Sequence, residues 1–441
     1  MSDQSLLKLF PNDFIKFLKK EKISRFYFVY DKKSKKVKAS HPVLTEIAQF
    51  IEDDNRDFEE HEGVFVQLSS KYDTLLGAFI HRTNRGQAAG GVRYWSYENM
   101  ENYIRDGLRL AKGMTHKNAL AGLWWGGGKG VMAHNPNVDK NDPAVREFLY
   151  KEYGKFITSI KGCYVTAEDV GTSVEDMGNI FTNTRFTTCI PHSVGGSGNP
   201  SIPTARGVVA GMEAAMEAAM HYLNGETLEG KTIAVQGLGH VAIPMINLLF
   251  EKNVGKIIAC DIFPEAVENA KSEFSGKNFR AYLVDNNDNS ILSEECDILA
   301  PCATGAVLNK NTIPSIKAKI ICGAANNQLE DPMNDDTRLF EKGIIYVPDF
   351  LTNRMGIVNC ADEQAGYVND DPIIERHLST DWEYSIHQTT LKVLEKSKAE
   401  NTPPGKVAIR IADKLSRENN PIYGHRSQLV INSLVESGWE R

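Results

Sequence analysis

The amino-acid sequence predicts an α/β protein of two domains, in which the second domain is a doubly wound parallel sheet. The chain has 441 residues, which is more than one ordinary domain holds. Its second half alternates short apolar runs with helical segments, the pattern of a parallel sheet covered by helices. One of those runs, at 232–235, leads into a glycine-rich turn and a helix. These observations predict the fold class before single elements are assigned.

Composition indicates a soluble globular protein and argues against several functions. Hydrophobic residues make up 41% of the chain and charged residues 24%, a globular balance. The net charge is −7, and the one short basic cluster, at 32–38, is expected to be a solvated loop, so we expect no nucleic-acid partner. No apolar run reaches the roughly 18 residues of a membrane span. Charges also interrupt the N-terminal segment where a signal peptide would be apolar.

The cysteines favour a reducing, cytoplasmic location. There are seven of them, an odd number, and no C-x-x-C pair is present, so we expect reduced thiols. No cluster of cysteine and histidine has the spacing of a zinc site, and we therefore expect no metal.

The first 95 residues carry local structure without an evident reactive group. We expect packing or oligomer contact from the first 62 residues and short β-strands from the next 33. Glycines at 86–91 are expected to form a turn between the last two strands. The expected elements are helices near 11–21 and 43–52, and strands near 26–30, 64–68, 75–82 and 90–95.

The stretch 113–132 delivers two lysines from two different elements. Apolar residues at three- and four-residue steps predict a helix over 97–121, which carries Lys117. Gly122 and three glycines at 126–128 are expected to break the chain before a strand that opens at Lys129. Most lysines are solvated, but two neighbouring tryptophans at 124–125 suggest an apolar wall, which would lower the pKa of Lys129 from about 10.4. A lysine so tuned could act as a general base.

An acidic pair follows the next predicted helix and strand. A helix is predicted over 143–161, and the strand after it runs into Glu168 and Asp169. Spacing alone leaves two interpretations of Asp169 open, a cap on the following helix or a chemical role. The Gly-, Ser- and Pro-rich stretch 193–204 is expected to be a linker, with a long helix over 205–223.

The start of the second domain carries a dinucleotide-binding pattern. Strand 232–235 is followed by G-x-G-x-x-A, a helix, and a second strand at 256–261 that ends in an acid. Strand, turn, helix and acid together predict a Rossmann unit, with bare backbone and a helix N-terminus facing the pyrophosphate. The acid would accept hydrogen bonds from ribose hydroxyls and repel a 2′-phosphate, which favours NAD over NADP. The residues expected at this site are Gly237, Leu238, Gly239, His240, Val241, Ala242, Asp261 and Ile262.

Three further strands complete the predicted parallel sheet. They are expected at 296–301, 318–325 and 343–349, with helices between them. Ligands of such sheets bind at the carboxyl ends of the strands, where Cys302, Ala303, Thr304, Ala325, Asn326 and Asn327 stand. Helix is expected over 363–397 with an interruption near 371–372, and one or two helices after a break at 401–405.

Three motifs resemble the Leu/Phe/Val amino-acid dehydrogenases of the glutamate dehydrogenase superfamily. They are M-T-x-K-N at 114–118, G-G-G-K at 126–129 and A-E-D-V-G-T at 167–172, and the resemblance extends from about Gly90 to Asn359. It implies that Lys117 holds the substrate α-carboxylate and that Lys129 and Asp169 are catalytic. It also implies a substrate pocket at Ala89, Gly90 and Gly91, nicotinamide contacts from Thr204, the 302–304 and 325–327 segments and Asn353, and substrate contact from Asn327.

Two segments depart from the family pattern. Arg354-Met355-Gly356 stands where Ala-Gly-Gly is usual, and Trp124-Trp125 replaces a polar or small residue followed by an aliphatic one. Because the first segment lies near the nicotinamide in the family, the departures put the shape of the pocket in question.

Together these observations predict a substrate domain, 1–195 with helices 400–441 returning to it, and an NAD domain, 196–399, around a cleft. The expected reaction is reversible, NAD-dependent oxidative deamination of an apolar L-α-amino acid of leucine or phenylalanine type to a 2-oxo acid and ammonia. We expect a homo-oligomer. Two alternatives remain open, a glutamate dehydrogenase and an NAD-binding regulatory homologue without turnover.

Overall fold

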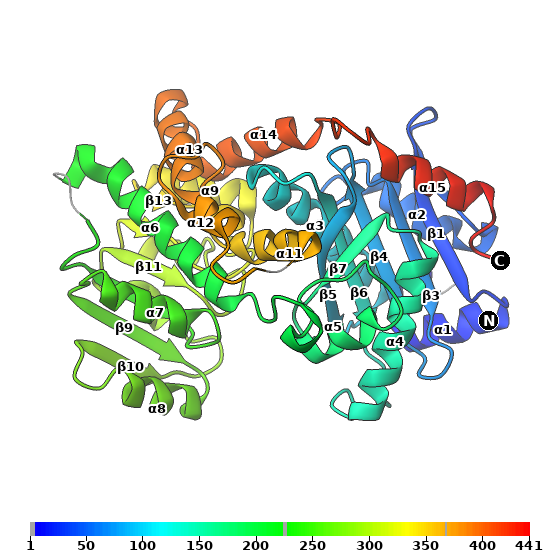
Figure 1. Ribbon diagram of the computed structural model, residues 1–441, viewed down its shortest axis with the longest axis horizontal. Helices are drawn as coiled ribbons and strands as arrows, with labels where there is room; N and C mark the ends of the chain where they lie inside the picture. Colours follow the sequence, from blue (N-terminus) through cyan, green and yellow to red (C-terminus); the bar gives the residue numbers. More distant parts are fainter. Residues whose placement is uncertain (1–4, 224–226, 367) are drawn as a thin grey trace. The chain divides into compact units, whose positions relative to one another are not determined.

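The computed structural model describes residues 5–223, 227–366 and 368–441, which divide into two compact units. The first unit comprises 1–199, 360–367 and 412–441, and the second comprises 200–359 and 368–411. Each unit is built on its own β-sheet with helices packed against it (Figure 1). The predicted α/β fold class is therefore confirmed.

The first unit contains a seven-stranded mixed sheet in the order β2-β1-β3-β4-β6-β5-β7. Strands β2, β1, β3, β4 and β6 pair antiparallel, whereas β5 runs parallel to both β6 and β7. Strand β6 therefore lies at the point where the sheet changes from antiparallel to parallel pairing. The strands are β1 (Arg25–Asp31), β2 (Lys36–Ala39), β3 (Gly63–Leu68), β4 (Leu75–Arg82), β5 (Ala88–Trp95), β6 (Gly126–Ala133) and β7 (Tyr164–Ala167).

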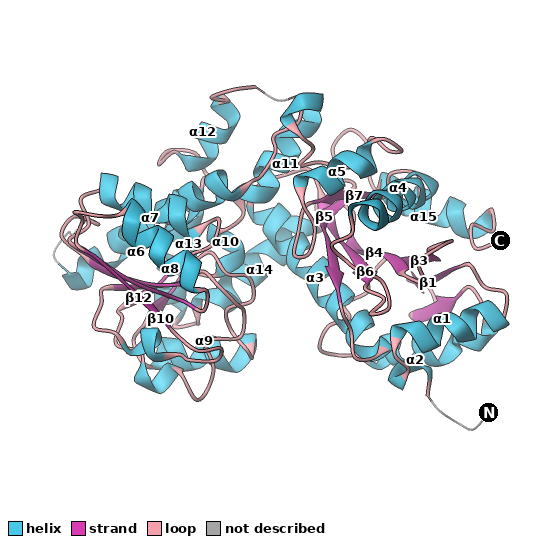
Figure 2. Ribbon diagram, turned by 90° about the horizontal axis from the view of Figure 1, so that it is seen from below, coloured by secondary structure: helices cyan, strands magenta, loops and turns pink. Residues whose placement is uncertain are grey.

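Helices cover both faces of this sheet (Figure 2). On one face, Phe14, Ile47 and Tyr103 pack against the sheet in one apolar cluster, and burying such side chains stabilises the fold by about 1.5–3 kcal/mol each. On the other face, Trp439 packs edge-on against Phe65. The first face is covered by α1 (Pro11–Lys20), α2 (Thr45–Asp53) and α3 (Met100–Leu120), and the second by α4 (Pro143–Ser159), α5 (Val174–Phe181) and α15 (Arg426–Glu436).

The basic cluster at 32–38 is only partly a loop, so that expectation was wrong. Its second half is β2, which pairs with β1. Lys36 and Lys38 alternate outward along this edge strand and form ion pairs with Glu52 and Asp31. Charged side chains on an edge strand keep it from pairing with another chain.

The second unit contains a six-stranded, fully parallel sheet in the order β10-β9-β8-β11-β12-β13. Numbered from its own first strand, the order is 3-2-1-4-5-6, that of a doubly wound dinucleotide-binding fold. The last two strands are much shorter than predicted. The strands are β8 (Thr232–Gln236), β9 (Lys256–Asp261), β10 (Phe279–Leu283), β11 (Ile298–Pro301), β12 (Ile320–Ile321) and β13 (Ile345–Tyr346).

Separate apolar clusters fill the two faces of the second sheet. On one face lie α6 (Ser201–Leu223), α7 (Ala242–Glu251) and α8 (Pro264–Glu273), and on the other lies α9 (Pro332–Glu341). Among the described residues, no helix is both long and apolar enough to cross a membrane. The remaining helices are α10 (Asp349–Thr352), α11 (Met355–Ala365), α12 (Pro372–Leu378), α13 (Ile386–Glu400) and α14 (Pro404–Ser416).

Helix α6 begins earlier than expected. The linker was expected to run to Thr204, but the helix starts at Ser201 and places Thr204 in its first turn, where its hydroxyl donates to Pro200 O at 2.8 Å. Pro203 does not prevent this, because N–H groups of a first turn have no partner within the helix.

Candidate functional site

The chain breaks at Gly122, after the end of α3, as expected, but the glycine triplet before Lys129 lies inside β6 and is not part of that break. Each glycine packs where a side chain would collide. A Cβ on Gly126 would lie 2.2 Å from Arg82 O, one on Gly127 would lie 1.9 Å from Thr115 Oγ1, and one on Gly128 would lie 2.8 Å from the ring of Tyr164. Glycine within a strand marks close approach of other groups. Lys129 is therefore held in the middle of a buried strand.

The glycine pair of β5 is also required by the close approach of neighbouring groups. Gly90 and Gly91 lie at the start of the strand expected at 90–95, and the alternative, a tight turn, is wrong, because both belong to the strand that pairs with β6 and β7. A Cβ on Gly90 would lie 2.0 Å from Gly128 O, and one on Gly91 would lie 2.6 Å from Glu168 O and 2.7 Å from Asp169 Cβ. The pair thus lets β6 and the Asp169 segment close onto β5.

Lys117 lies in the last turn of α3, and its neighbours bind that turn to the sheet. Asn118 Nδ2 donates to Gly126 O at 2.6 Å and to Ala89 O at 3.3 Å. Ala89 is 1% exposed. The structure thus brings the predicted residues of the first unit together in one region, because the turn carrying Lys117 packs on the strands that carry Ala89 and Lys129.

Lys129 and Asp169 form a buried ion pair. Lys129 Nζ lies 2.9 Å from Asp169 Oδ2, and Lys129 is 4% exposed. Burial lowers the pKa of Lys129, while Asp169 acts to raise it. Burial acts to raise the pKa of Asp169, but Lys129 and then Arg93 outweigh it and hold that pKa below its ordinary value. The pair can therefore consist of an ionised carboxylate and a lysine that gives up its proton readily.

Asp169 does not cap the helix that follows it, so the capping interpretation is wrong and the chemical role of Asp169 stays a prediction. The cap of α5 is Ser173, which accepts from Asp176 N, and Asp176 completes the capping box. The carboxylate of Asp169 is directed to the two cations, Lys129 and Arg93.

Sequence inspection missed three polar residues of this region. Arg93 bridges Asp169 and Asp106, and Asp106 is a buried acid on the sheet-facing side of α3. Burial raises the pKa of Glu168 to about 7, and neighbouring acids add to the effect. The signal for Arg93 was its place two residues after Gly91. Asp106 could be recognised only from the fold, because its partner Arg93 lies on β5, and the raised pKa of Glu168 depends on burial, which the sequence does not show.

Trp124 does not form the apolar wall beside Lys129 that the sequence suggested. Trp124 is 45% exposed, and the guanidinium of Arg85 lies over its ring, 4.2 Å from the centroid. Arg85 Nε also donates to Leu123 O at 2.8 Å. The tryptophan is therefore part of an arginine-fixed turn, and the low-dielectric surroundings of Lys129 come from the sheet itself.

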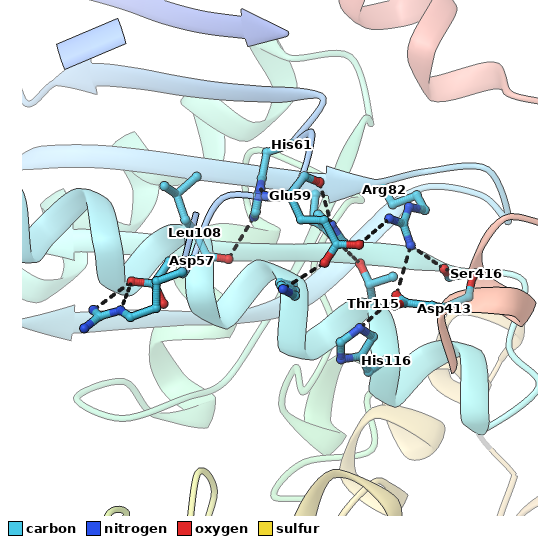
Figure 3. Close-up of polar contacts among 12 residues, drawn as sticks. Asp57, Glu59, His61, Arg82, Leu108, Thr115, His116, Asp413 and Ser416 are labelled. Atoms are coloured by element: carbon cyan, nitrogen blue, oxygen red, sulfur yellow. Dashed lines mark hydrogen bonds and ion pairs between the residues drawn. The ribbon is translucent and has the colours of Figure 1, made fainter. Parts of the chain in front are cut away.

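A buried network holds α3 near Lys117 (Figure 3). His81 Nε2 lies 3.1 Å from Glu59 O, and its Nδ1 lies 2.7 Å from Thr115 Oγ1. Because a carbonyl only accepts, Nε2 carries the proton and Nδ1 accepts from the hydroxyl. The ring of His61 is tilted against that of His81, with 4.5 Å between the ring centroids, and its Nε2 lies 2.9 Å from Leu108 O. Two neutral imidazoles thus fix the threonine against which Gly127 packs.

The same network binds the C-terminal segment to the sheet of the first unit. Arg82 Nη1 donates to Ser416 Oγ at 2.7 Å and lies 3.3 Å from Asp413 Oδ1, and its Nη2 lies 3.1 Å from Glu59 Oε1. His116 Nε2 lies 3.1 Å from the same oxygen of Asp413. Figure 3 shows these groups meeting between β4, α3 and the end of α14.

In the second unit, the turn after β8 has the features of a dinucleotide cradle. Gly237 has φ of +94°, and a Cβ there would lie 2.8 Å from Ala303 Cβ, whereas a Cβ on Gly239 would meet nothing within 4 Å. Asp261 accepts from Leu238 N at 2.7 Å and from Phe263 N at 2.9 Å. Open backbone at the turn and an acid at the end of β9 fit the diphosphate and ribose of a dinucleotide.

The other predicted cofactor residues gather at the carboxyl ends of neighbouring strands. Cys302 N donates to Gln236 O at 2.8 Å, at the ends of β11 and β8. Asn353 Nδ2 donates to Asn326 Oδ1 at 2.8 Å and to Ala324 O at 3.1 Å. His240 and Ile262 are exposed beside the turn, and Ala303, Thr304, Ala325 and Asn327 follow β11 and β12. Within the described ranges, no group of three or more metal-ligating side chains is placed to hold a metal ion.

Arg354, the main departure from the family pattern, is wholly buried within the second unit. Its Nη2 donates to Thr389 Oγ1 at 3.1 Å and to Tyr384 O, and burial lowers its pKa to about 9. These bonds connect the start of α11 to α13 and the segment before it. The substitution is therefore explained by internal packing.

Comparisons with known proteins agree with this arrangement. A family model described as Glu/Leu/Phe/Val dehydrogenase, dimerisation domain, matches residues 66–186, and one described as Glutamate/Leucine/Phenylalanine/Valine dehydrogenase matches 264–417. Leucine dehydrogenase of Bacillus subtilis is 44% identical over 354 residues, 80% of this chain and 90% of the relative. Valine dehydrogenase of Streptomyces albus is 36% identical over 339 residues, 77% and 87% of the two chains.

A comparison with solved structures also finds an amino-acid dehydrogenase. The crystal structure of L-tryptophan dehydrogenase from Nostoc punctiforme matches with a TM-score of 0.64 and 32% identity, covering 81% of this chain and 96% of that one. The first unit holds a buried lysine–aspartate pair, and the second holds a parallel sheet of the dinucleotide-binding type. Together with the matches to known proteins, these features place the protein among the amino-acid dehydrogenases. Within that class, the chain belongs to the Glu/Leu/Phe/Val dehydrogenase family.

The buried histidines predict a loss of stability in acid. Burial lowers the pKa of His61 from 6.5 to about 3 and that of His81 well below 6.5. Below pH 6.5 the unfolded chain binds protons that the folded chain does not, so each histidine lowers the free energy of unfolding by about 1.4 kcal/mol per pH unit as pH falls toward its folded pKa.

Urea unfolding between pH 7.5 and 4.5 measures this dependence. His61→Gln keeps an amide donor for Leu108 O but cannot titrate, so its stability should fall less steeply with pH than that of the wild type. The exposed His192→Gln, in the same unit, should follow the wild type. Parallel curves for all three proteins would contradict the assignment.

Proposed function

We propose that the protein catalyses reversible, NAD-dependent oxidative deamination of an apolar L-α-amino acid of leucine or phenylalanine type to the 2-oxo acid and ammonia. The observation that carries the proposal is the buried contact of 2.9 Å between Lys129 Nζ and Asp169 Oδ2. A lysine that burial has removed from water can act as the base, and the ionised carboxylate in contact with it can carry a proton within the same site. Membership of the family and the similarity to leucine dehydrogenases support the reaction class.

We assign the two compact units different tasks. The first unit acts as the substrate domain, with the ammonium of Lys117 pairing with the substrate α-carboxylate. The second unit acts as the NAD domain, with the diphosphate at Gly237–Gly239 and the adenosine ribose at Asp261. NAD, when bound, supplies the hydride acceptor. The match of 66–186 to a dimerisation domain supports a homo-oligomer.

The residues of the first unit then move the protons. Asp169 takes a proton from the substrate amino group as the Cα–H bond breaks and a C=N bond forms. Lys129, whose pKa is lowered by burial so that its neutral amine forms more readily, takes a proton from the water that attacks this carbon. Asp169 returns its proton to the nitrogen as the C–N bond breaks and ammonia leaves, and the added hydroxyl group releases its proton to solvent as the C=O bond forms. These steps give the amino group and the attacking water a base each.

The two alternatives, a glutamate dehydrogenase and an NAD-binding regulatory homologue without turnover, have less support. A glutamate side chain needs a cation, and position 89 is an enclosed alanine. Arg354 is bonded to acceptors of its own unit, which disfavours it as a substitute. A regulatory homologue without turnover would have no need to keep a buried lysine–aspartate contact, which is costly to desolvate.

The first test of the proposed mechanism is Lys129→Ala. We expect it to lose nearly all NADH formation while the dissociation constant for NAD, measured by titration, stays near that of the wild type, because the lysine belongs to the other unit. Lys117→Ala should mainly raise KM for the amino acid. If Lys129→Ala kept more than about a tenth of the wild-type kcat, roughly 1.4 kcal/mol in barrier, then Lys129 would not be the base.

The second test concerns the cofactor. We expect kcat/KM to be much higher with NAD than with NADP, because the Asp261 carboxylate would repel the 2′-phosphate. Asp261→Ser should reduce the difference in kcat/KM between NAD and NADP. Asp261→Asn is the matched variant, since it removes the charge and keeps an oxygen that accepts from Leu238 N. Comparable wild-type rates with both cofactors would refute the assignment of Asp261.

The third test concerns the substrate. We expect kcat/KM for leucine and phenylalanine to exceed that for glutamate, because burying a carboxylate without a partner is costly. Initial rates with leucine, phenylalanine, tryptophan and glutamate provide the measurement. A glutamate value at or above the others would overturn the proposed substrate class, and its loss in Arg354→Met would then identify Arg354 as the responsible cation.

A further inference from the structure

The carboxylate of Asp169 is held by two cations at the same oxygen. Lys129 Nζ lies 2.9 Å from Oδ2, and Arg93 Nε donates to that oxygen at 3.3 Å. In the parts of the chain that the structure describes, no residue donates a hydrogen bond to Oδ1. One oxygen is therefore engaged by the protein, and the other is left for a group from outside.

Arg93 is itself fixed from α3. Its Nη1 donates to both oxygens of Asp106, at 3.0 and 3.2 Å. Asp106 also accepts from Tyr97 Oη at 2.7 Å and from Arg109 Nη2 at 2.9 Å. Charge-assisted bonds of this kind are short and directional. The guanidinium thus spans from an anchored carboxylate on the helix to the carboxylate beside Lys129.

The charge of Arg93 acts on both members of the Lys129–Asp169 pair. It is one of the two cations that hold the pKa of Asp169 low against burial. It also adds to burial in lowering the pKa of Lys129. A neutral side chain at 93 would therefore leave Lys129 with a higher pKa and Asp169 less firmly ionised.

We propose that Arg93 is a positioning residue for the reaction. Together with Lys129 it holds Oδ2 of Asp169, so that Oδ1 is the oxygen that exchanges a proton with the substrate nitrogen. The Asp106–Arg93 pair fixes the direction of the carboxylate, as the partner of a catalytic base does in other enzymes. This inference rests on the proposed function, since it assigns Asp169 a proton to carry.

A purely structural role would predict something different. If the Arg93–Asp106 pair only tied β5 to α3, its removal would lower stability and leave the titration of Lys129 unchanged. Arg105 offers a matched control for that case. It lies on α3, forms ion pairs with Asp54 and Asp57, and does not contact Arg93 or Asp169.

The kinetic test compares Arg93→Gln, Arg93→Lys and Arg105→Gln with the wild type, using leucine and NAD. We expect Arg93→Gln to lower kcat by about tenfold or more with a smaller change in KM. The acidic limb of its kcat/KM profile should move up by about 1 pH unit. Arg93→Lys should recover part of both effects, and Arg105→Gln should match the wild type. If Arg93→Gln left both kcat and the acidic limb of the kcat/KM profile unchanged, the proposal would be overturned.

A second measurement needs no turnover. In protein labelled with ¹³C at lysine Cε, the Lys129 resonance can be assigned from its absence in Lys129→Ala and followed against pH. We expect Lys129 in Arg93→Gln to lose its proton at higher pH than in the wild type and in Arg105→Gln. Equal titration in all three would overturn the inference. A wild type without NADH formation from apolar amino acids would refute the proposed function, whatever the resonance shows.

Discussion

The structure of the first unit depends on placing an ammonium group beside a carboxylate inside a β-sheet. Such a pair is expensive to desolvate and is stable only when its geometry is held from several sides. Lys129 lies in the interior of β6, where glycines at 126–128 let neighbouring groups approach without side chains. Gly91 lets the segment of Asp169 close onto β5. The glycines are therefore the means by which the ion pair is assembled.

Around that pair, rigid contacts replace solvent. Thr115 is fixed by His81, Asn118 bonds to Gly126 O, and Arg93 connects Asp169 to α3. These contacts set the direction of each charged group before a substrate arrives, which is how an enzyme avoids reorganisation during the reaction. The second unit is simpler, because a parallel sheet and an open glycine turn provide the features that fit a dinucleotide.

Much of this could be predicted from the sequence where the signal is local. The G-x-G-x-x-A turn between two strands and the acid at 261 identified the second fold, and motif resemblance singled out Lys129 and Asp169, which the structure places in contact. The conformation of 126–128 was assigned wrongly, and that of 90–91 was left between a turn and a strand, because a glycine-rich sequence can form either a turn or a strand crowded by backbone. Arg93, Asp106 and the His61–His81 network were missed because their partners lie on other elements. Trp124 was misjudged for the same reason, since Arg85 is distant in sequence.

The central claim is that the amine of Lys129 is the base for turnover of an apolar amino acid. It can be measured directly by replacing Lys129 with cysteine and alkylating the thiol with 2-bromoethylamine, which restores an amine at nearly the same distance from the backbone. The rate of NADH formation from leucine should be negligible in Lys129→Cys and should recover substantially after alkylation, while wild-type protein treated identically keeps its rate. Full activity before alkylation, or no recovery after complete alkylation, would contradict the account.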